Sequence, residues 1–237
     1  MHKIPVMEIF GPTIQGEGAV IGVKTMFVRT AGCDYQCAWC DSAFTWDGTA
    51  KEQIRQLTPA EIVDELLAIG GDRFAHVTIS GGNPALIGQP MEELIALLQA
   101  RQLRVGLETQ GSRWQDWFTR LDQLTISPKP PSSGMQTDFT VLDEIVRRSN
   151  PARTSLKVVV FDDQDFAYAK AIHQRYPTVP FYVQAGNEQV DEPGDISPRL
   201  LAKLAWLFQK VIDDPEMNHV RVLPQLHALV WHNQRGK

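Results

Sequence analysis

All three cysteines of this 237-residue chain lie in one short stretch, GCDYQCAWCD, as Cys33, Cys37 and Cys40. Three thiols this close cannot all pair with one another, and clustered thiolates are soft ligands for metals. A structural zinc site needs four ligands, usually in two separated pairs, and the histidines of this chain show no such pairing. Three thiolates can instead hold three irons of a cubane cluster and leave the fourth iron open. The spacing therefore favours an open [4Fe-4S] cluster over zinc.

Short apolar runs alternate with helical patterns along the chain, which predicts βαβ units and a parallel sheet with helices on its outside. We expect strands at 25–32, 76–82, 104–111, 123–130, 155–161, 180–186 and 219–225. Most of these runs end in small or polar residues, so a shared ligand site is expected at the carboxyl ends of the strands.

The helical patterns fall near 59–70, 91–100, 137–148, 163–175 and 198–212. The first of them opens on Thr58-Pro59-Ala60-Glu61, where threonine is the expected N-cap, proline the first helical residue and glutamate the third. This is the clearest helix start in the sequence.

The composition is that of an ordinary globular protein, with 43% apolar and 22% charged residues and a formal net charge of −5. The length suits one large α/β domain or two small ones. No apolar run approaches the roughly 18 residues that a membrane span needs, and the N-terminus has no apolar signal core. We therefore expect a cytoplasmic protein. The lack of a Lys/Arg-rich run argues against nucleic acid as a partner.

The motif Cys-x3-Cys-x2-Cys after a strand, with Trp39 before the last cysteine, resembles the radical S-adenosylmethionine (SAM) superfamily. In that superfamily SAM chelates the open iron, and an electron cleaves SAM to a 5′-deoxyadenosyl radical. ISGGNP (79–84) resembles the glycine-rich segment that approaches the methionine amino group of SAM, although this chain has Asn83 where glutamate is common. The resemblance implies a single-domain partial (β/α)6 barrel over residues 1–237.

Further segments are similar to the 7-carboxy-7-deazaguanine synthases, and the resemblance runs from residue 8 to about 227. They are FGPTIQGEG (10–18), GCDYQCAWCDSAFTW (32–46), ISGGNP, LETQG (107–111) and TISPKPP (125–131). The resemblance implies conversion of 6-carboxy-5,6,7,8-tetrahydropterin to 7-carboxy-7-deazaguanine with release of ammonia, in the biosynthesis of queuosine and other 7-deazapurines. Residues from about 228 to 237 extend past the end of many family members.

The resemblance also implies roles for individual residues. The positions that match pterin contacts are Ile14, Gln15, Gly16, Glu17, Arg29 and Ser80. Among them, the Arg29 guanidinium suits a substrate carboxylate, which it can bind through two parallel hydrogen bonds. The positions that match SAM contacts are Trp39, Cys40, Asp41, Gly82, Ser127, Pro128 and Lys129. Glu108 and Gln184 are weaker candidates for the adenosine half of SAM, because strand-end position alone places them.

Ser42 matches the hydroxyl residue that family members use for Mg²⁺. One neutral hydroxyl is a poor magnesium site without anionic help, so we expect Mg²⁺ there only together with the substrate carboxylate. The family resemblance further suggests a homodimer and an electron donor such as flavodoxin or ferredoxin.

Two other classes of protein remain open at this stage. One is a radical SAM activase that installs a glycyl radical in a partner protein, which would not require the Gln15-Gly16-Glu17 segment, Arg29 or Ser42. The other is a non-catalytic iron–sulfur or zinc module, against which the single cysteine cluster and the acidic net charge argue.

Overall fold

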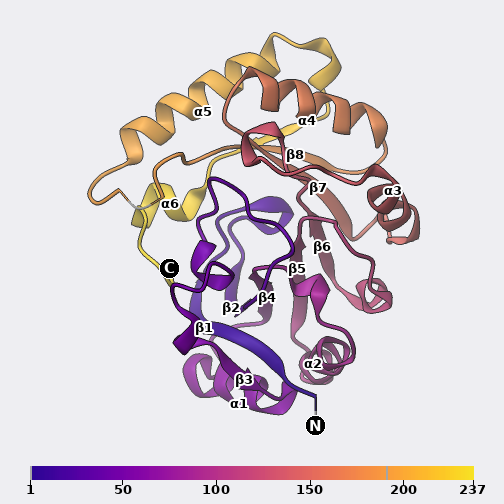
Figure 1. Cartoon of the computed structure of the whole chain (residues 1–237), viewed down its shortest axis with the longest axis vertical. Helices are drawn as coiled ribbons and strands as arrows, with labels where there is room; N and C mark the ends of the chain where they lie inside the picture. The colour runs from indigo at the N-terminus through magenta and orange to yellow at the C-terminus, as the bar shows by residue number, and fades with distance from the viewer. Residues whose placement is uncertain (1, 191) are drawn as a thin grey trace.

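One nine-stranded sheet organises the chain, in the order β3-β1-β2-β4-β5-β6-β7-β8-β9, and helices pack around it (Figure 1). The computed structural model describes residues 2–190 and 192–237. The strands are β1 (Ile4–Ile14), β2 (Lys24–Thr30), β3 (Arg55–Leu57), β4 (His76–Gly81), β5 (Arg104–Thr109), β6 (Gln123–Ile126), β7 (Thr154–Val160), β8 (Phe181–Ala185) and β9 (Arg221–Leu223). From β2 through β4 to β9 neighbouring strands run parallel, which confirms the predicted α/β class with a mainly parallel sheet.

The helices are α1 (Pro59–Gly70), α2 (Gln89–Ala100), α3 (Phe139–Arg148), α4 (Asp163–Arg175), α5 (Ser197–Ile212) and α6 (Leu226–Trp231). All but α6 occupy segments that the sequence pattern predicts, whereas α6 lies where no helix was expected. The capping box at the start of α1 is confirmed: the Thr58 hydroxyl accepts from the Glu61 amide at 3.3 Å, and the Glu61 carboxylate accepts from the Thr58 amide at 2.7 Å. Short 3-10 turns lie at Gly18–Val20, Ala43–Thr45, Lys51–Gln53, Pro84–Leu86, Asp116–Arg120, Pro131–Ser133 and Pro215–Met217.

The sequence pattern missed the N-terminal strand β1. This strand pairs antiparallel with both β2 and β3, and its register against β2 shifts between Val6 and Glu8 and again between Phe10 and Thr13. The Gly11-Pro12 pair interrupts the alternation that would have marked it. Because β1 runs against β2, its last residue Ile14 lies beside Lys24 at the start of β2, and the chain after Ile14 enters the pocket from there.

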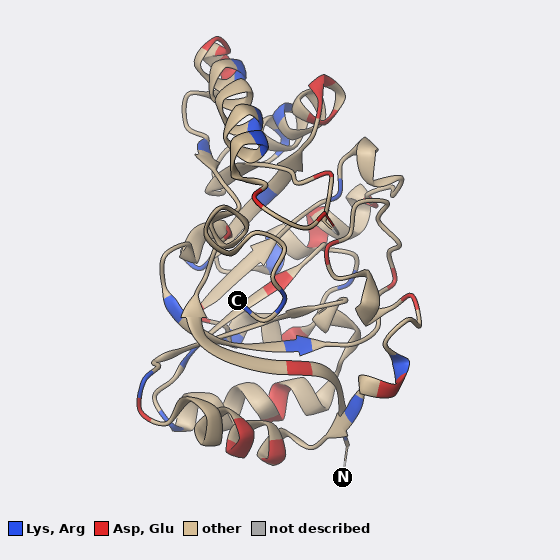
Figure 2. Cartoon of the chain, turned by 90° about the vertical axis from the view of Figure 1, so that its left-hand side faces the viewer, with Lys and Arg blue, Asp and Glu red and all other residues tan. Residues whose placement is uncertain are grey.

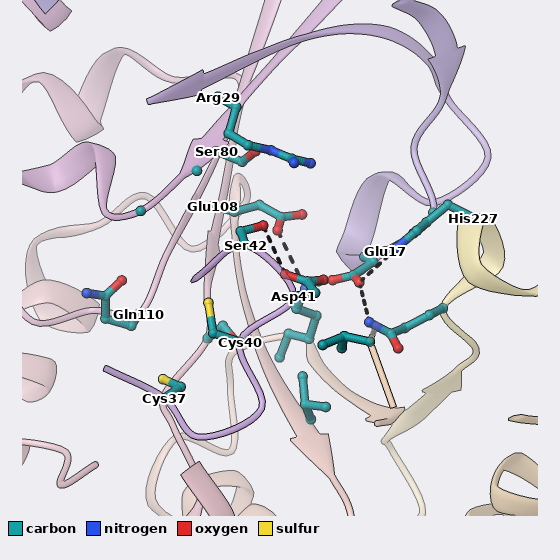
Figure 3. A pocket seen from close by; sticks show the side chains of 18 of the residues that line it. Glu17, Arg29, Cys37, Cys40, Asp41, Ser42, Ser80, Glu108, Gln110 and His227 are labelled. Atoms are coloured by element: carbon teal, nitrogen blue, oxygen red, sulfur yellow. Dashed lines mark hydrogen bonds and ion pairs between the residues drawn. The ribbon is translucent and has the colours of Figure 1, made fainter. Parts of the chain in front are cut away.

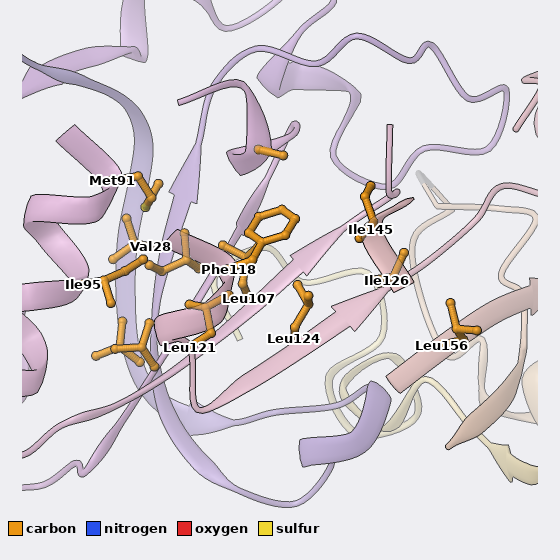
Figure 4. Packing of buried hydrophobic residues seen from close by; sticks show 14 of the residues in the cluster. Val28, Met91, Ile95, Leu107, Phe118, Leu121, Leu124, Ile126, Ile145 and Leu156 are labelled. Carbon is orange, nitrogen blue, oxygen red and sulfur yellow. The ribbon is translucent and has the colours of Figure 1, made fainter. Parts of the chain in front are cut away.

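The main apolar core lies between the sheet and its helices (Figure 4), and two much smaller apolar clusters lie apart from it. Val28, Leu107, Leu124 and Leu156 extend from four different strands toward it. Burying side chains of this kind contributes about 1.5–3 kcal/mol each, so the core holds the strand ends in fixed relative positions.

Charged residues of both signs are spread over helices and loops (Figure 2). Among the described residues, none of the helices combines the length and apolarity that crossing a membrane requires.

Candidate active site

A pocket lies at the carboxyl ends of the strands and gathers nearly all the predicted site residues (Figure 3). Those that line it are Ile14, Gln15, Gly16, Glu17, Arg29, Cys33, Cys37, Trp39, Cys40, Asp41, Ser42, Ser80, Gly82, Ser127 and Lys129. Pro128, between two lining residues, is not part of the wall. Of the two weaker candidates, Glu108 lines the pocket and Gln184 does not. Residues that the sequence analysis placed in two groups, for pterin and for SAM, therefore share one cavity.

The cysteine loop leaves the end of β2 and presents three free thiols to this pocket. Backbone hydrogen bonds hold the loop in place, from the Gly32 amide to the Thr45 carbonyl at 2.9 Å and from the Ala38 amide to the Ser133 carbonyl at 3.0 Å. Burial raises the pKa of the Cys37 thiol to about 11, and nearby Lys129 only partly offsets this. Three thiols on one loop, open to a cavity, suit a cluster whose iron replaces their protons.

Gly81 and Gly82 let the end of β4 approach the backbone of the cysteine loop. A Cβ atom on Gly81, where φ is +120°, would lie 2.2 Å from the Thr30 carbonyl oxygen, and one on Gly82 would lie 2.0 Å from that of Gly32. The Gly82 amide donates to the Thr30 carbonyl at 3.0 Å. Glycine is therefore required at positions 81 and 82 for close backbone packing, independently of the SAM contact expected at Gly82.

Asn83 is occupied by the protein itself. Its side chain is buried, and its amide nitrogen donates to Asp34 at 2.8 Å and to Ser112 at 2.9 Å. Its carbonyl oxygen accepts from the Thr109 hydroxyl at 2.8 Å and from the Ala85 amide at 3.2 Å. With all these bonds made, Asn83 serves to hold the glycine-rich turn against β5 and the cysteine loop.

Side chains outside the motif donate toward two of the sulfurs. The Gln110 amide lies 3.6 Å from Cys33 Sγ, and Trp46 Nε1 lies 3.5 Å from Cys40 Sγ. Hydrogen bonds to ligand sulfurs are one of the means by which a protein sets the reduction potential of a cluster.

The wall next to the loop carries Trp39 and Lys129. Trp39 Nε1 donates to the Ser132 hydroxyl at 2.9 Å, which fixes the indole. Lys129 Nζ lies 5.7 Å from the centre of the Trp39 ring and 3.3 Å from the Ser127 hydroxyl. An ammonium group at this point is available to a carboxylate ligand.

Glu17 is the centre of the opposite wall. One of its carboxylate oxygens accepts from Lys157, and the other accepts from Gln225 Nε2 at 3.0 Å, with His227 Nε2 at 4.0 Å. Burial alone would raise the pKa of Glu17, but Lys157, His227 and Gln225 together lower it below its ordinary value. Glu17 is therefore an ionised carboxylate within the pocket.

The segment Gln15-Gly16-Glu17 is held between the sheet and helix α6. Gln15 donates to Glu108 at 3.1 Å. A Cβ atom on Gly16 would lie 2.3 Å from His227 Nδ1, so only glycine lets α6 pack this closely. The Leu226 amide donates to the Gly16 carbonyl at 3.0 Å.

Arg29 points into the pocket from β2 beside Ser80 of the adjacent β4 (Figure 3). Its guanidinium is 2.7 Å from Glu8 and lies 5.3 Å and 5.4 Å from the ring centres of Phe10 and Phe44. Arg29 Nε is buried and finds no acceptor in the part of the chain that the structure describes. A donor of this group thus remains for an incoming carboxylate.

The C-terminal extension reaches the same pocket, where Lys237 is part of the wall. Arg235 fixes this tail, because its guanidinium lies 2.9 Å from Glu8 and 3.8 Å from the centre of the Phe44 ring. The sequence analysis expected this segment to extend past many family members and did not place it in the fold.

Oxygen donors gather near the predicted magnesium position. The Ser42 hydroxyl donates to Asp41 at 3.0 Å, and it does not cap the 3-10 turn that follows it. Ligand atoms of Asp41, Glu17 and His227 lie within 4.8 Å of one another. Among these groups, the Ser42 hydroxyl and the Asp41 carboxylate are the hard oxygen donors that suit Mg²⁺ when a substrate carboxylate adds further charge.

Sequence reasoning missed Lys157, Gln110, Trp46 and Asn187, all of which line the pocket. A signal for Lys157 existed, since it is a lysine inside the apolar run SLKVVVF. Gln110 and Trp46 stand in LETQG and GCDYQCAWCDSAFTW, two of the segments that carry the family resemblance, but neither residue was given a role. Asn187 had no signal, because amide side chains in loops are common and only the fold brings this one to the pocket.

The fold and the cysteine loop define the class of protein. Residues 27–159, just over half of the chain, match the family model of the Radical SAM superfamily. The chain is 61% identical to a 7-carboxy-7-deazaguanine synthase of Bacillus cereus, over all of both chains. It is 59% identical to that of Bacillus subtilis, over 98% of each. The chain belongs to the family of the 7-carboxy-7-deazaguanine synthases.

The fold is also that of a solved structure. A crystal structure of QueE from Escherichia coli superimposes with a TM-score of 0.69 over 95% of both chains, at 20% identity. This likeness supports the fold, with its open, mainly parallel sheet and surrounding helices.

Proposed function

We propose that this protein is a radical SAM enzyme that converts 6-carboxy-5,6,7,8-tetrahydropterin to 7-carboxy-7-deazaguanine with release of ammonia. One observation carries the proposal: a chain 61% identical from end to end to a named synthase brings its three thiols, Glu17 and Arg29 into one pocket. The glycyl-radical activase and the non-catalytic module leave that pairing of thiols with a carboxylate-binding wall unexplained.

Cys33, Cys37 and Cys40 would hold the [4Fe-4S] cluster. When bound and reduced, the cluster and SAM supply a 5′-deoxyadenosyl radical, which removes a hydrogen atom from the substrate. The side chains proposed to hold SAM are Trp39, Asp41, Ser127 and Lys129, with Gly82 and Pro128 at the turns beside them. In this assignment Lys129 binds the methionine carboxylate as a cation.

The opposite wall would bind the pterin. Arg29 takes the substrate carboxylate through its unused donors, and Ser80 lies beside it. Glu17 accepts from the amino and ring N–H groups of the pterin, while Ile14, Gln15 and Gly16 shape the cavity around it. The ionised state of Glu17 suits an acceptor of two hydrogen bonds.

We assign Mg²⁺ to the Ser42 hydroxyl together with the substrate carboxylate. Asp41 would bind one of the metal's waters, since its carboxylate already lies 3.0 Å from Ser42. The metal would then help Arg29 to neutralise the substrate carboxylate.

We further propose that residues 1–237 act as one domain in the cytoplasm, with about 228–237 as an extension, and that the chain forms a homodimer. The enzyme requires a reductant, and a flavodoxin or ferredoxin is the proposed donor. The net charge of −5 is consistent with a protein that does not bind nucleic acid.

An anaerobic assay tests the function. The reconstituted protein, reductant, SAM, Mg²⁺ and the carboxytetrahydropterin should yield the deazaguanine, identified by ultraviolet absorbance and mass, with one ammonia per product. The Cys40→Ala variant is the matched control and should give none. Stoichiometric zinc in place of iron, together with no product from the wild-type protein, would overturn the proposal.

A further inference from the structure

Lys157 is a buried cation that the roles proposed so far leave unused. It lies in the middle of β7, a strand whose every residue is buried, and its side chain is 4% exposed. Lysine is almost never buried to this extent without a partner. Lys157 is nevertheless one of the residues that line the active-site pocket.

Two carboxylates share this one ammonium. Lys157 Nζ donates to Glu17 Oε2 and lies 3.6 Å from Glu108 Oε2. The remaining oxygen of each carboxylate is also bonded, Glu17 to Gln225 at 3.0 Å and Glu108 to Gln15 at 3.1 Å. Lys157 thus joins the Gln15-Gly16-Glu17 segment to strands β5 and β7.

We propose that Lys157 is a positioning residue, which keeps Glu17 ionised and aimed at the aminopyrimidinone edge of the pterin. This inference rests on the proposed function. In this role Lys157 acts on the substrate through Glu17, whose carboxylate makes the contact. A buried carboxylate without a cation partner takes up a proton, and a protonated carboxyl can no longer accept two hydrogen bonds through charged oxygens.

The charges around Glu17 favour Lys157 as the group that decides its state. Glu17 faces Lys157 from β7, His227 from α6 and Asp41 from the cysteine loop, and Glu108 of β5 shares the Lys157 ammonium with it. Asp41 and Glu108 are acidic, and His227 is 4.0 Å away. Lys157 is therefore the nearest cation. Burial would lower the pKa of Lys157, but Glu108 and Glu17 raise it above its ordinary value, so it stays charged.

Three single variants separate this role from a general loss of stability. Lys157→Met removes the charge at similar length, and Lys157→Arg keeps it. Lys170→Met is the matched control, because Lys170 of α4 also pairs with two carboxylates, Asp214 and Glu216, away from the pocket. The probe is 6-carboxypterin, the oxidised and fluorescent form of the substrate, titrated anaerobically into each reconstituted protein without reductant.

We expect Lys157→Met to weaken 6-carboxypterin binding on the order of 100-fold, as for other buried charge pairs that lose one partner. Lys157→Arg should stay within about tenfold of the wild-type protein, and Lys170→Met within about twofold. Iron content and SAM affinity should not change in any of them. Binding to Lys157→Met should also weaken further from pH 8 to pH 6 as Glu17 takes up a proton, while wild-type binding stays flat.

A double-mutant cycle tests whether Lys157 acts through Glu17, and it remains informative if Lys157→Met alone does not fold. Glu17→Gln with Lys157→Met should bind 6-carboxypterin within about threefold of Glu17→Gln alone. The same cycle with Glu108→Gln should be additive. Wild-type affinity in Lys157→Met, or a Lys157→Met loss that persists in the Glu17→Gln background, would overturn the inference. A wild-type protein that binds SAM but neither binds nor converts the pterin would instead overturn the proposed function.

Discussion

The pocket has two halves, one around Glu17 and one around the three cysteines, and they balance their charges in different ways. Around Glu17, a buried lysine and side-chain amides of the protein already pair with the oxygens of two carboxylates. Around the cysteines, burial raises the pKa of all three thiols, and Lys129 is the cation that opposes it. The first half is therefore formed by the protein itself, whereas the second is completed only when iron displaces the thiol protons.

The largest effect should follow from removing a cluster ligand. Cys37→Ala leaves two thiols, which cannot hold three irons of a cubane, so cluster and product should both fall below detection. Iron and sulfide analysis and the electron paramagnetic resonance signal of the reduced protein measure this. The difference between the halves predicts that the variant still binds 6-carboxypterin within about tenfold of the wild-type affinity. A loss of pterin binding as large as the loss of iron would contradict it.

The thiols of the iron-free protein should react slowly with alkylating reagents. A pKa of about 11 at Cys37 leaves its thiol protonated at pH 8, so its carboxamidomethylation should be on the order of 100-fold slower than that of free cysteine. The rate should rise with each pH step up to about 11, because only the thiolate reacts.

Mass spectrometry of the Cys37 peptide over time gives this rate. Unfolding in urea is the control and should restore the ordinary cysteine rate, since burial is the main cause of the shift. Rapid alkylation of the folded protein at pH 7 would show that Cys37 is already a thiolate before iron binds, and would contradict the difference between the two halves of the pocket.

Removing Arg29 should damage the other half and spare the cluster. Arg29→Ala deletes the guanidinium proposed for the substrate carboxylate, so KM should rise about 30-fold or more with iron content unchanged. Arg29→Lys should recover only part of this, since an ammonium cannot bind a carboxylate bidentately. Arg175→Ala, which breaks a surface pair with Asp143, is the control and should leave KM unchanged. A fall in kcat with constant KM would argue against a binding role.

The smallest effect concerns the contact that joins the cysteine loop to β4. Gly82→Ala would place a methyl group 2.0 Å from the Gly32 carbonyl oxygen, so the loop must shift, at about 1–3 kcal/mol of unfolding free energy. Iron incorporation should fall with it. Gly88→Ala, where nothing lies within 4 Å of the added Cβ, should cost less than about 1 kcal/mol. Denaturant unfolding of the iron-free proteins compares the two, and equal losses would show that close backbone approach is not the reason for Gly82.

Much of the fold was predictable because it follows from local patterns. The apolar runs of β4 to β8 and the capping box at Thr58 appear in the structure where periodicity and end signals predict them. β1 was missed because Gly11-Pro12 breaks its alternation, and an antiparallel strand needs only part of its residues to be apolar.

The site was predictable where chemistry depends on spacing within the chain. Cys33, Cys37 and Cys40 must lie on one loop to hold one cluster, so the sequence by itself determined the class of cofactor, and the motifs around them determined the family. The pairing of other side chains in the pocket could not be predicted, because no local pattern records a partner 140 residues away, as Glu17 is from Lys157.

Only the tertiary structure decided which charges meet. Lys157 lies between Glu17 and Glu108. The Asn83 side chain forms hydrogen bonds with Asp34, Ser112 and Thr109. The C-terminal residues 235–237 fold back so that Lys237 lines the pocket. The physical reason is that such contacts depend on how parallel strands align their carboxyl ends, which long-range packing determines and local sequence does not.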